Sequence, residues 1–110
     1  MKTEINSQEE LTGIIENESA VLVYFFNNSC APCVSLRPKV EELLQVKFPL
    51  MKFVTVDSEK NQALAASKNI FSSPTLIIFL EGREYRRESK YISIPQLQES
   101  IERPYSMIFE

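Results

Sequence analysis

The chain has 110 residues, of which 44% are hydrophobic and 25% are charged, and this composition is typical of one globular domain. We therefore expect a single domain over residues 1–110. The sequence contains no histidine, which excludes Ser-His and Cys-His catalytic pairs and every zinc site with a histidine ligand. Lys and Arg number 12 against 15 Asp and Glu, without a long basic run, so nucleic-acid binding is not expected.

Segments that target proteins to membranes or for export are not recognisable in this sequence. The amino terminus carries no apolar core of a signal peptide, and no apolar run reaches the roughly 18 residues that a membrane span needs. We therefore expect a cytoplasmic protein that does not contact membranes. Its two cysteines, Cys30 and Cys33, are too few for a secreted disulfide scaffold and form a Cys-x-x-Cys motif instead.

The segment before the cysteines predicts a helix and a buried strand, and residues 2–5 a short edge strand. Ser7 and Glu10 have the spacing of a capping box, and the apolar residues that follow recur at helical intervals. This pattern predicts a helix over about 7–17. Residues 20–26 are continuously apolar and rich in branched and aromatic side chains, which is typical of a central parallel strand buried on both faces.

A second helix is expected to follow the cysteines directly and to reach about residue 46. Pro38 lies inside it, lacks an N–H group, and should kink the helix near its first turns. A strand over 51–56 comes next, and Asp57 or Ser58 is expected to cap a third, weaker helix that ends near Asn69. The apolar face of the second helix is expected to hold Val34, Leu36, Val40, Leu43 and Leu44, and that of the third helix Ala63, Leu64 and Ala66.

The remaining chain predicts a hairpin and a last helix. Residues 75–80 are fully apolar, and Glu81–Gly82 marks a turn before a charged edge strand over 83–90. A second capping box predicts a helix over about 94–103 that stops at Pro104. The apolar tail over 104–110 is expected to pack against its own subunit in preference to a second copy.

The order of these elements predicts an α/β fold, in which a small mixed sheet carries helices on both faces. Helical crossovers connect parallel strands, and the final hairpin adds an antiparallel edge.

The cysteine motif follows a buried strand and opens a helix, and this placement has chemical consequences. Residues three apart in a first helical turn lie on one face, so the two sulfurs can close a small ring. Cys30 would lie at the helix N-terminus, where free N–H groups and the helix dipole favour the thiolate, and is the candidate nucleophile. Cys33 would be less accessible and suited to attack a mixed disulfide formed on Cys30.

Three other readings of the cysteines remain open at this point. The pair could be half of a zinc site completed by carboxylates or a second subunit. It could hold an iron–sulfur cluster shared between two chains. The cysteines could also be two inert buried residues.

Several motifs together resemble the thioredoxin family over nearly the whole chain. The run from Val21 to Cys33, which ends in Ser29-Cys30-Ala31-Pro32-Cys33, is similar to the family's active-site strand and loop. Pro38 matches its kinking helix proline, Ser73-Pro74-Thr75 its cis-proline segment facing the disulfide, and Gly82 its hairpin glycine. The resemblance implies the thioredoxin fold, with a small central mixed sheet flanked by four helices.

The resemblance also implies a function. A redox-active Cys30–Cys33 disulfide would carry out thiol–disulfide exchange, and neither a further cofactor nor a metal is expected. Substrates would be disulfide-containing proteins, and a donor of the thioredoxin-reductase type would supply electrons. A monomer is expected, with a weak dimer as the alternative. The substrate would bind between a cis Pro74, the main chain of Ser73, and the loop formed by Ser29, Ala31 and Pro32.

Departures from the family's pattern surround the expected site. Ser29 stands where a tryptophan is usual, and Tyr24 and Phe53 align with the family's buried aspartate and its lysine partner. Ser72 and Lys90 replace glycines near the groove. A phenol is a poor base at neutral pH, so Tyr24 is either a core aromatic with a satisfied hydroxyl or the mark of an altered proton path. The alternative function is a binding, adaptor or redox-sensor module with little reductase activity.

Overall fold

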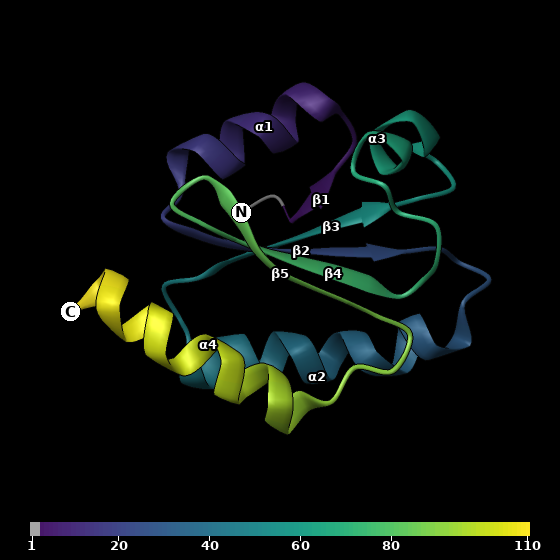
Figure 1. Ribbon diagram of the computed structural model, residues 1–110. Helices are drawn as coiled ribbons and strands as arrows, with labels where there is room; N and C mark the ends of the chain where they lie inside the picture. The colour runs from purple at the N-terminus through teal and green to yellow at the C-terminus, as the bar shows by residue number, and fades with distance from the viewer. Residues whose placement is uncertain (1–2) are drawn as a thin grey trace.

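A computed structural model describes residues 3–110 as one mixed sheet between two layers of helices (Figure 1). Helices α1 and α3 cover one face of the sheet, and α2 and α4 cover the other. Lys2 of the expected edge strand lies outside the described residues. The elements are β1 (Glu4–Ile5), α1 (Gln8–Asn17), β2 (Ala20–Phe26), α2 (Ala31–Lys47), β3 (Lys52–Asp57), α3 (Gln62–Ser67), β4 (Thr75–Leu80), β5 (Arg83–Ser89) and α4 (Ile94–Phe109).

The five strands of the sheet follow the order β1-β3-β2-β4-β5. Strands β1, β3 and β2 are parallel, whereas β4 runs antiparallel to β2, and β5 antiparallel to β4. The mixed sheet is therefore confirmed. Its antiparallel part is larger than the sequence predicted, because β4 pairs antiparallel with β2, although the helical crossover before β4 was expected to make it parallel.

Strand β2 is apolar throughout because both of its faces are covered. Val21, Val23 and Phe25 pack with α1 and α3, whereas Leu22 and Tyr24 pack with α2 and α4. Alternate side chains of a strand point to opposite faces, so the same run of residues contributes to both cores. This arrangement directs Tyr24 toward the helix that carries the cysteines.

Two predicted helix faces differ from the observed ones. Val34 is 69% exposed, because Cys33 and Val40 occupy the face of α2 that meets the sheet. Helix α3 buries Leu64 and Ala65 rather than the predicted Ala63 and Ala66. Its N-cap is Asn61, not Asp57 or Ser58. The Asp57 carboxylate instead accepts hydrogen bonds from the N–H groups of Glu59 and Lys60 in the preceding turn.

Helix α4 does not stop at Pro104, contrary to the prediction, and continues to Phe109. A proline inside a helix leaves the carbonyl four residues earlier without its usual N–H donor. That carbonyl belongs to Ser100, and the hydroxyl of Tyr85 on β5 donates a hydrogen bond to it at 3.1 Å. A side chain from the neighbouring strand thus replaces the missing donor, and the helix can run through the proline.

The last turns of α4 pack on this subunit, as expected for the tail. The ring of Tyr105 lies 5.0 Å from that of Phe48 and 4.7 Å from that of Phe109, measured between centroids. Its hydroxyl accepts a hydrogen bond from the N–H of Leu50 at 2.9 Å. Among residues 3–110, no helix has the length and apolar character that crossing a bilayer requires.

Candidate active site

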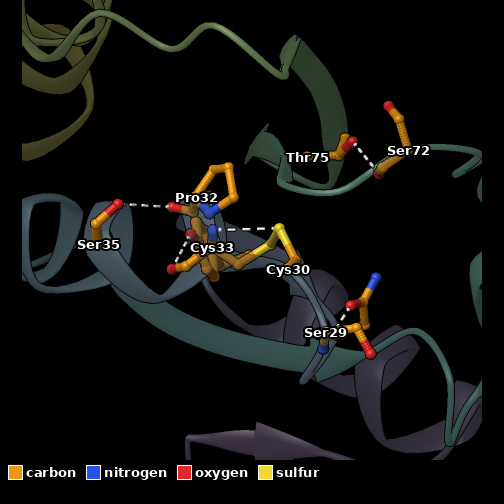
Figure 2. Close-up of a disulfide and its surroundings, with 9 residues drawn as sticks. Ser29, Cys30, Pro32, Cys33, Ser35, Ser72 and Thr75 are labelled. Carbon is orange, nitrogen blue, oxygen red and sulfur yellow. Dashed lines mark hydrogen bonds between the residues drawn. A yellow bond between two sulfur atoms is a disulfide. The ribbon is translucent and has the colours of Figure 1, made fainter.

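The two cysteines form a disulfide at the start of α2 (Figure 2). Cys30 is the N-cap of this helix, and the Cα atoms of Cys30 and Cys33 lie 5.3 Å apart. The N–H of Cys33 donates a hydrogen bond to the Sγ of Cys30 at 3.2 Å. A sulfur thus takes the position that a serine or aspartate oxygen takes in an ordinary N-cap, where N–H donors and the helix dipole stabilise negative charge. This geometry favours a thiolate on Cys30 once the disulfide is reduced.

The loop between β2 and α2 is held by its own hydrogen bonds. The side-chain oxygen of Asn27 accepts from the N–H of Ser29, and its main-chain oxygen accepts from the N–H of Cys30. Exposure differs along the motif: Cys33 is 2% exposed, whereas Cys30 is partly exposed. Cys30 is therefore the more accessible of the two cysteines. The neighbouring Ser29, Ala31 and Pro32 are exposed.

The Ser73–Pro74 peptide bond is cis, as the resemblance implied. The hydroxyl of Thr75 donates to the carbonyl of Ser72 at 2.7 Å, and the N–H of Lys90 donates to the carbonyl of Pro74 at 2.9 Å. These bonds tie the proline loop to strand β4 and to the end of β5. Figure 2 shows the loop with Ser72 and Thr75 near the disulfide.

A groove of about 410 Å³ begins beside the disulfide. Pro32 and Pro74 line it together, so the cysteine loop and the proline loop meet at one groove, which is where the resemblance implies that a substrate would bind. The groove also includes Lys39 from α2 and Tyr91 from the segment after β5, which the sequence analysis did not single out. Lys39 directly follows Pro38, which lies inside α2 as predicted. Its place on the helix that carries the cysteines was the signal that could have identified it.

Tyr24 lies directly beneath Cys33. Its side chain is fully buried, and its hydroxyl donates a hydrogen bond to the main-chain oxygen of Cys33 at 2.8 Å. Burial raises the pKa of Tyr24 to about 12, and the positive charge of Arg37 opposes this shift only in part. The hydroxyl is satisfied, as one of the two sequence interpretations held. With this pKa it stays protonated at neutral pH and cannot act as a general base there.

The neighbours of Tyr24 are an aromatic ring and an ion-paired arginine, where the family has a buried lysine. Phe53, which aligns with the family's lysine, lies with its ring 6.3 Å from that of Tyr24. Arg37 lies over the ring of Phe26, with 5.7 Å to its centroid, and pairs with Glu41 on the next turn of α2. The sequence analysis overlooked Arg37, although its place four residues after Cys33 puts both on one side of the helix.

Within residues 3–110, no group of three or more His, Cys, Asp or Glu side chains is placed to hold a metal ion. The zinc and iron–sulfur readings of the cysteines would therefore need ligands from a second molecule.

Comparison with known proteins agrees with the fold and the motif. The family model Thioredoxin matches residues 2–103. A thioredoxin from Mycoplasmoides gallisepticum is 31% identical over 97 residues, which cover 88% of this chain and 96% of that protein. The thioredoxin-like protein YdfQ from Bacillus subtilis is 23% identical over 105 residues, covering 96% of this chain and 93% of that protein.

Solved structures give the same result. The structure of Fasciola hepatica thioredoxin superposes with a TM-score of 0.81 at 31% identity, covering 92% of this chain and 97% of that one. A mixed five-stranded sheet, a Cys-x-x-Cys disulfide opening a helix, and a cis-proline beside it define one class of protein, the thiol–disulfide oxidoreductases of the thioredoxin fold. The chain belongs to the thioredoxin family.

Proposed function

We propose that this chain reduces disulfides in other proteins through a Cys30/Cys33 dithiol–disulfide cycle. The Cys30 thiolate attacks one sulfur of the substrate disulfide, forms a mixed disulfide, and releases the other substrate sulfur as a thiolate. The Cys33 thiol then loses its proton, and its thiolate attacks the sulfur of Cys30. The second substrate sulfur leaves as a thiolate, and the Cys30–Cys33 disulfide forms. Two electrons have passed to the substrate.

The observation that carries this proposal is the difference between the two cysteines. Cys30 is partly exposed at the N-cap of α2 and accepts the N–H of Cys33, which favours its thiolate. Cys33 is 2% exposed and is already bonded to the sulfur that it would attack in the second step. Each cysteine therefore has the surroundings that its proposed role requires.

The substrate would lie across the exposed loop of Ser29, Ala31 and Pro32 and along the proline loop. Ser73 would offer its main-chain N–H and C=O to an extended segment of the substrate, in the manner of an added strand. Pro74 would shape that surface and contact the substrate disulfide. Pro38 and Tyr24 would support the site: Pro38 by shaping α2, and the buried Tyr24 by holding the carbonyl of Cys33.

The cycle needs a source of electrons, and we propose a donor of the thioredoxin-reductase type acting on the Cys30–Cys33 disulfide. Nucleic acids and membranes are not among the proposed partners, because the sequence has no long basic run and no apolar run of membrane-spanning length. We propose a monomer that works in the cytoplasm, where reduced thiols are maintained. No cofactor beyond the disulfide itself is required by these steps.

A disulfide reduction assay with the purified chain tests the proposal. The wild type should reduce a protein disulfide with dithiothreitol as electron donor, faster than dithiothreitol alone. Cys30→Ser should lose this activity, because no attacking thiolate remains. An unchanged rate in Cys30→Ser would contradict the proposal.

One observation favours a second function, that of a binding or redox-sensing module with little reductase activity. The phenol of Tyr24 replaces the acid that assists the resolving step in the family, and with a pKa of about 12 it cannot accept the proton of Cys33 at neutral pH. A module of this kind would form and break the Cys30–Cys33 disulfide but would turn over substrate no faster than a small dithiol. The same assay separates the two functions.

A further inference from the structure

The groove beside the disulfide has an apolar floor and a basic rim. Leu36, Pro74 and Ile92 are half-buried or buried along its length. The rim includes Tyr91, which is 95% exposed, and two lysines, Lys39 and Lys90. We call this surface the Lys39/Lys90 groove. It begins at Pro32, so a segment that binds to Cys30 and extends in this direction lies along a surface lined by both lysines.

The position of Lys90 is fixed by its main chain. Its N–H is bonded to the carbonyl of Pro74, and its φ of 64° lies in the left-handed region, where glycine is favoured and other side chains are strained. The family has a glycine here by resemblance. This chain instead holds a long cationic side chain at a strained position next to the cis-proline, which adds charge to the rim of the groove.

The charge of the groove is not balanced by its own residues. Among the described residues that line it, none is acidic, and the structure records no ion pair for either lysine within residues 3–110. The surface on the other side of the proline loop differs, because Glu59 lines it together with Ser73 and the exposed Phe71. The charge along the site is therefore asymmetric: positive on the side of Lys90 and negative on the side of Glu59.

We propose that the substrates of this chain carry acidic side chains on one side of their reactive cysteine, the side that lies in the Lys39/Lys90 groove. This inference rests on the proposed function and narrows its substrate class to extended polypeptides with such an acidic flank. Opposite charges across an exposed surface contribute mainly to encounter and orientation, so the preference acts on the attack by Cys30. Apolar side chains of the same segment would contact Leu36 and Ile92 on the floor.

Two peptides of identical composition test the proposal. Each has one cysteine with a run of glutamates on one side and a run of glutamines on the other, and the order is reversed between them. Each cysteine is joined to thionitrobenzoate, so that attack by Cys30 at the peptide sulfur releases the coloured thiolate and leaves a peptide mixed disulfide. Rates with dithiothreitol correct for the intrinsic reactivity of each peptide.

At low ionic strength, one of the two peptides should react about 3- to 10-fold faster with the reduced protein, the size expected for two exposed ion pairs. The difference should shrink at about 0.5 M salt because of screening. It should disappear in Lys39→Gln/Lys90→Gln, in which both long side chains remain but the charges are removed. Lys47→Gln is the matched control, because Lys47 ends α2 at the far end from the cysteines, and it should keep the preference.

Equal rates for the two peptides would overturn the inference and leave the proposed function intact. A preference that survives in Lys39→Gln/Lys90→Gln would overturn it as well, and each single variant provides the same comparison should the double variant fail to fold. A rate that does not fall in Cys30→Ser with either peptide would instead contradict the proposed function, and with it this inference.

Discussion

Replacing Tyr24 tests whether the missing acid limits the resolving step. In Tyr24→Asp, a carboxylate would stand beneath Cys33, where the phenol now donates to the Cys33 carbonyl at 2.8 Å. In the matched control Tyr24→Phe, the ring stays and only the hydroxyl is lost. With its pKa raised to about 12 by burial, that hydroxyl holds its proton at neutral pH, so its removal should leave the resolving rate unchanged.

The expected magnitudes follow from these contacts. A positioned general base contributes a factor of about 10² to 10⁴, of which water replaces a part, so resolution in Tyr24→Asp should be at least about 10-fold faster near pH 7. The loss of a fully buried ring and the burial of a carboxyl should lower the free energy of unfolding by about 3 to 5 kcal/mol. Tyr24→Phe should cost only about 1 kcal/mol, the contribution of one hydrogen bond.

The assay is a single turnover between the reduced protein and a peptide disulfide, stopped by acid at successive times. Acid protonates the thiolates and halts exchange, so mass spectrometry can follow the decay of the Cys30 mixed disulfide. Tyr24→Glu fills more of the space and serves should Tyr24→Asp be too unstable to fold. Folded acidic variants that resolve no faster than the wild type would refute the reasoning, and so would a 10-fold slower resolution in Tyr24→Phe.

Three further predictions concern stability and are measured by denaturant unfolding. The pKa of Tyr24 is about 12 in the folded chain and 10.0 for a free tyrosine side chain, so the unfolded chain loses this proton first as pH rises. The free energy of unfolding should therefore fall by roughly 2 to 3 kcal/mol between pH 10 and pH 12. Tyr24→Phe should not show this loss. Deleting residues 105–110 removes the Tyr105 contacts with Phe48 and Leu50 and should cost on the order of 3 kcal/mol; an unchanged midpoint would mean that the tail does not pack as described. Glu81 and Gly82 both have positive φ values, 53° and 81°, a pattern in which Asn-Gly is preferred, so Glu81→Asn should stabilise the hairpin by about 0.5 to 1 kcal/mol, whereas destabilisation would argue against this turn.

Much of the fold could be predicted from local patterns. Apolar runs identified β2 and β4, and the capping boxes at Ser7 and Ser93 gave the starts of α1 and α4, where both hydroxyls accept main-chain N–H groups. The cis bond at Pro74 came from the family resemblance alone, since a proline before a strand is usually trans.

The differences arise where distant residues decide the local structure. Helix α4 runs through Pro104 because Tyr85 of β5 supplies a donor to Ser100, and no pattern around the proline contains that partner. Val34 looked like a core residue, but Cys33 takes the buried position one residue earlier. The candidate site shows the same limit: the sequence gives Lys39, Lys90 and Tyr91 no common pattern, and only folding brings them to one groove.

The central claim is that Cys30 attacks substrate and Cys33 releases it. Trapping of mixed disulfides by the two single variants tests this claim most directly. Each reduced variant is mixed with a protein disulfide, the free thiols are blocked, and the covalent complexes are separated without reductant and mapped by mass spectrometry. Cys33→Ser should accumulate complexes linked through Cys30, because nothing resolves them, whereas Cys30→Ser should trap little, because Cys33 is 2% exposed. Equal trapping by both variants would contradict the claim.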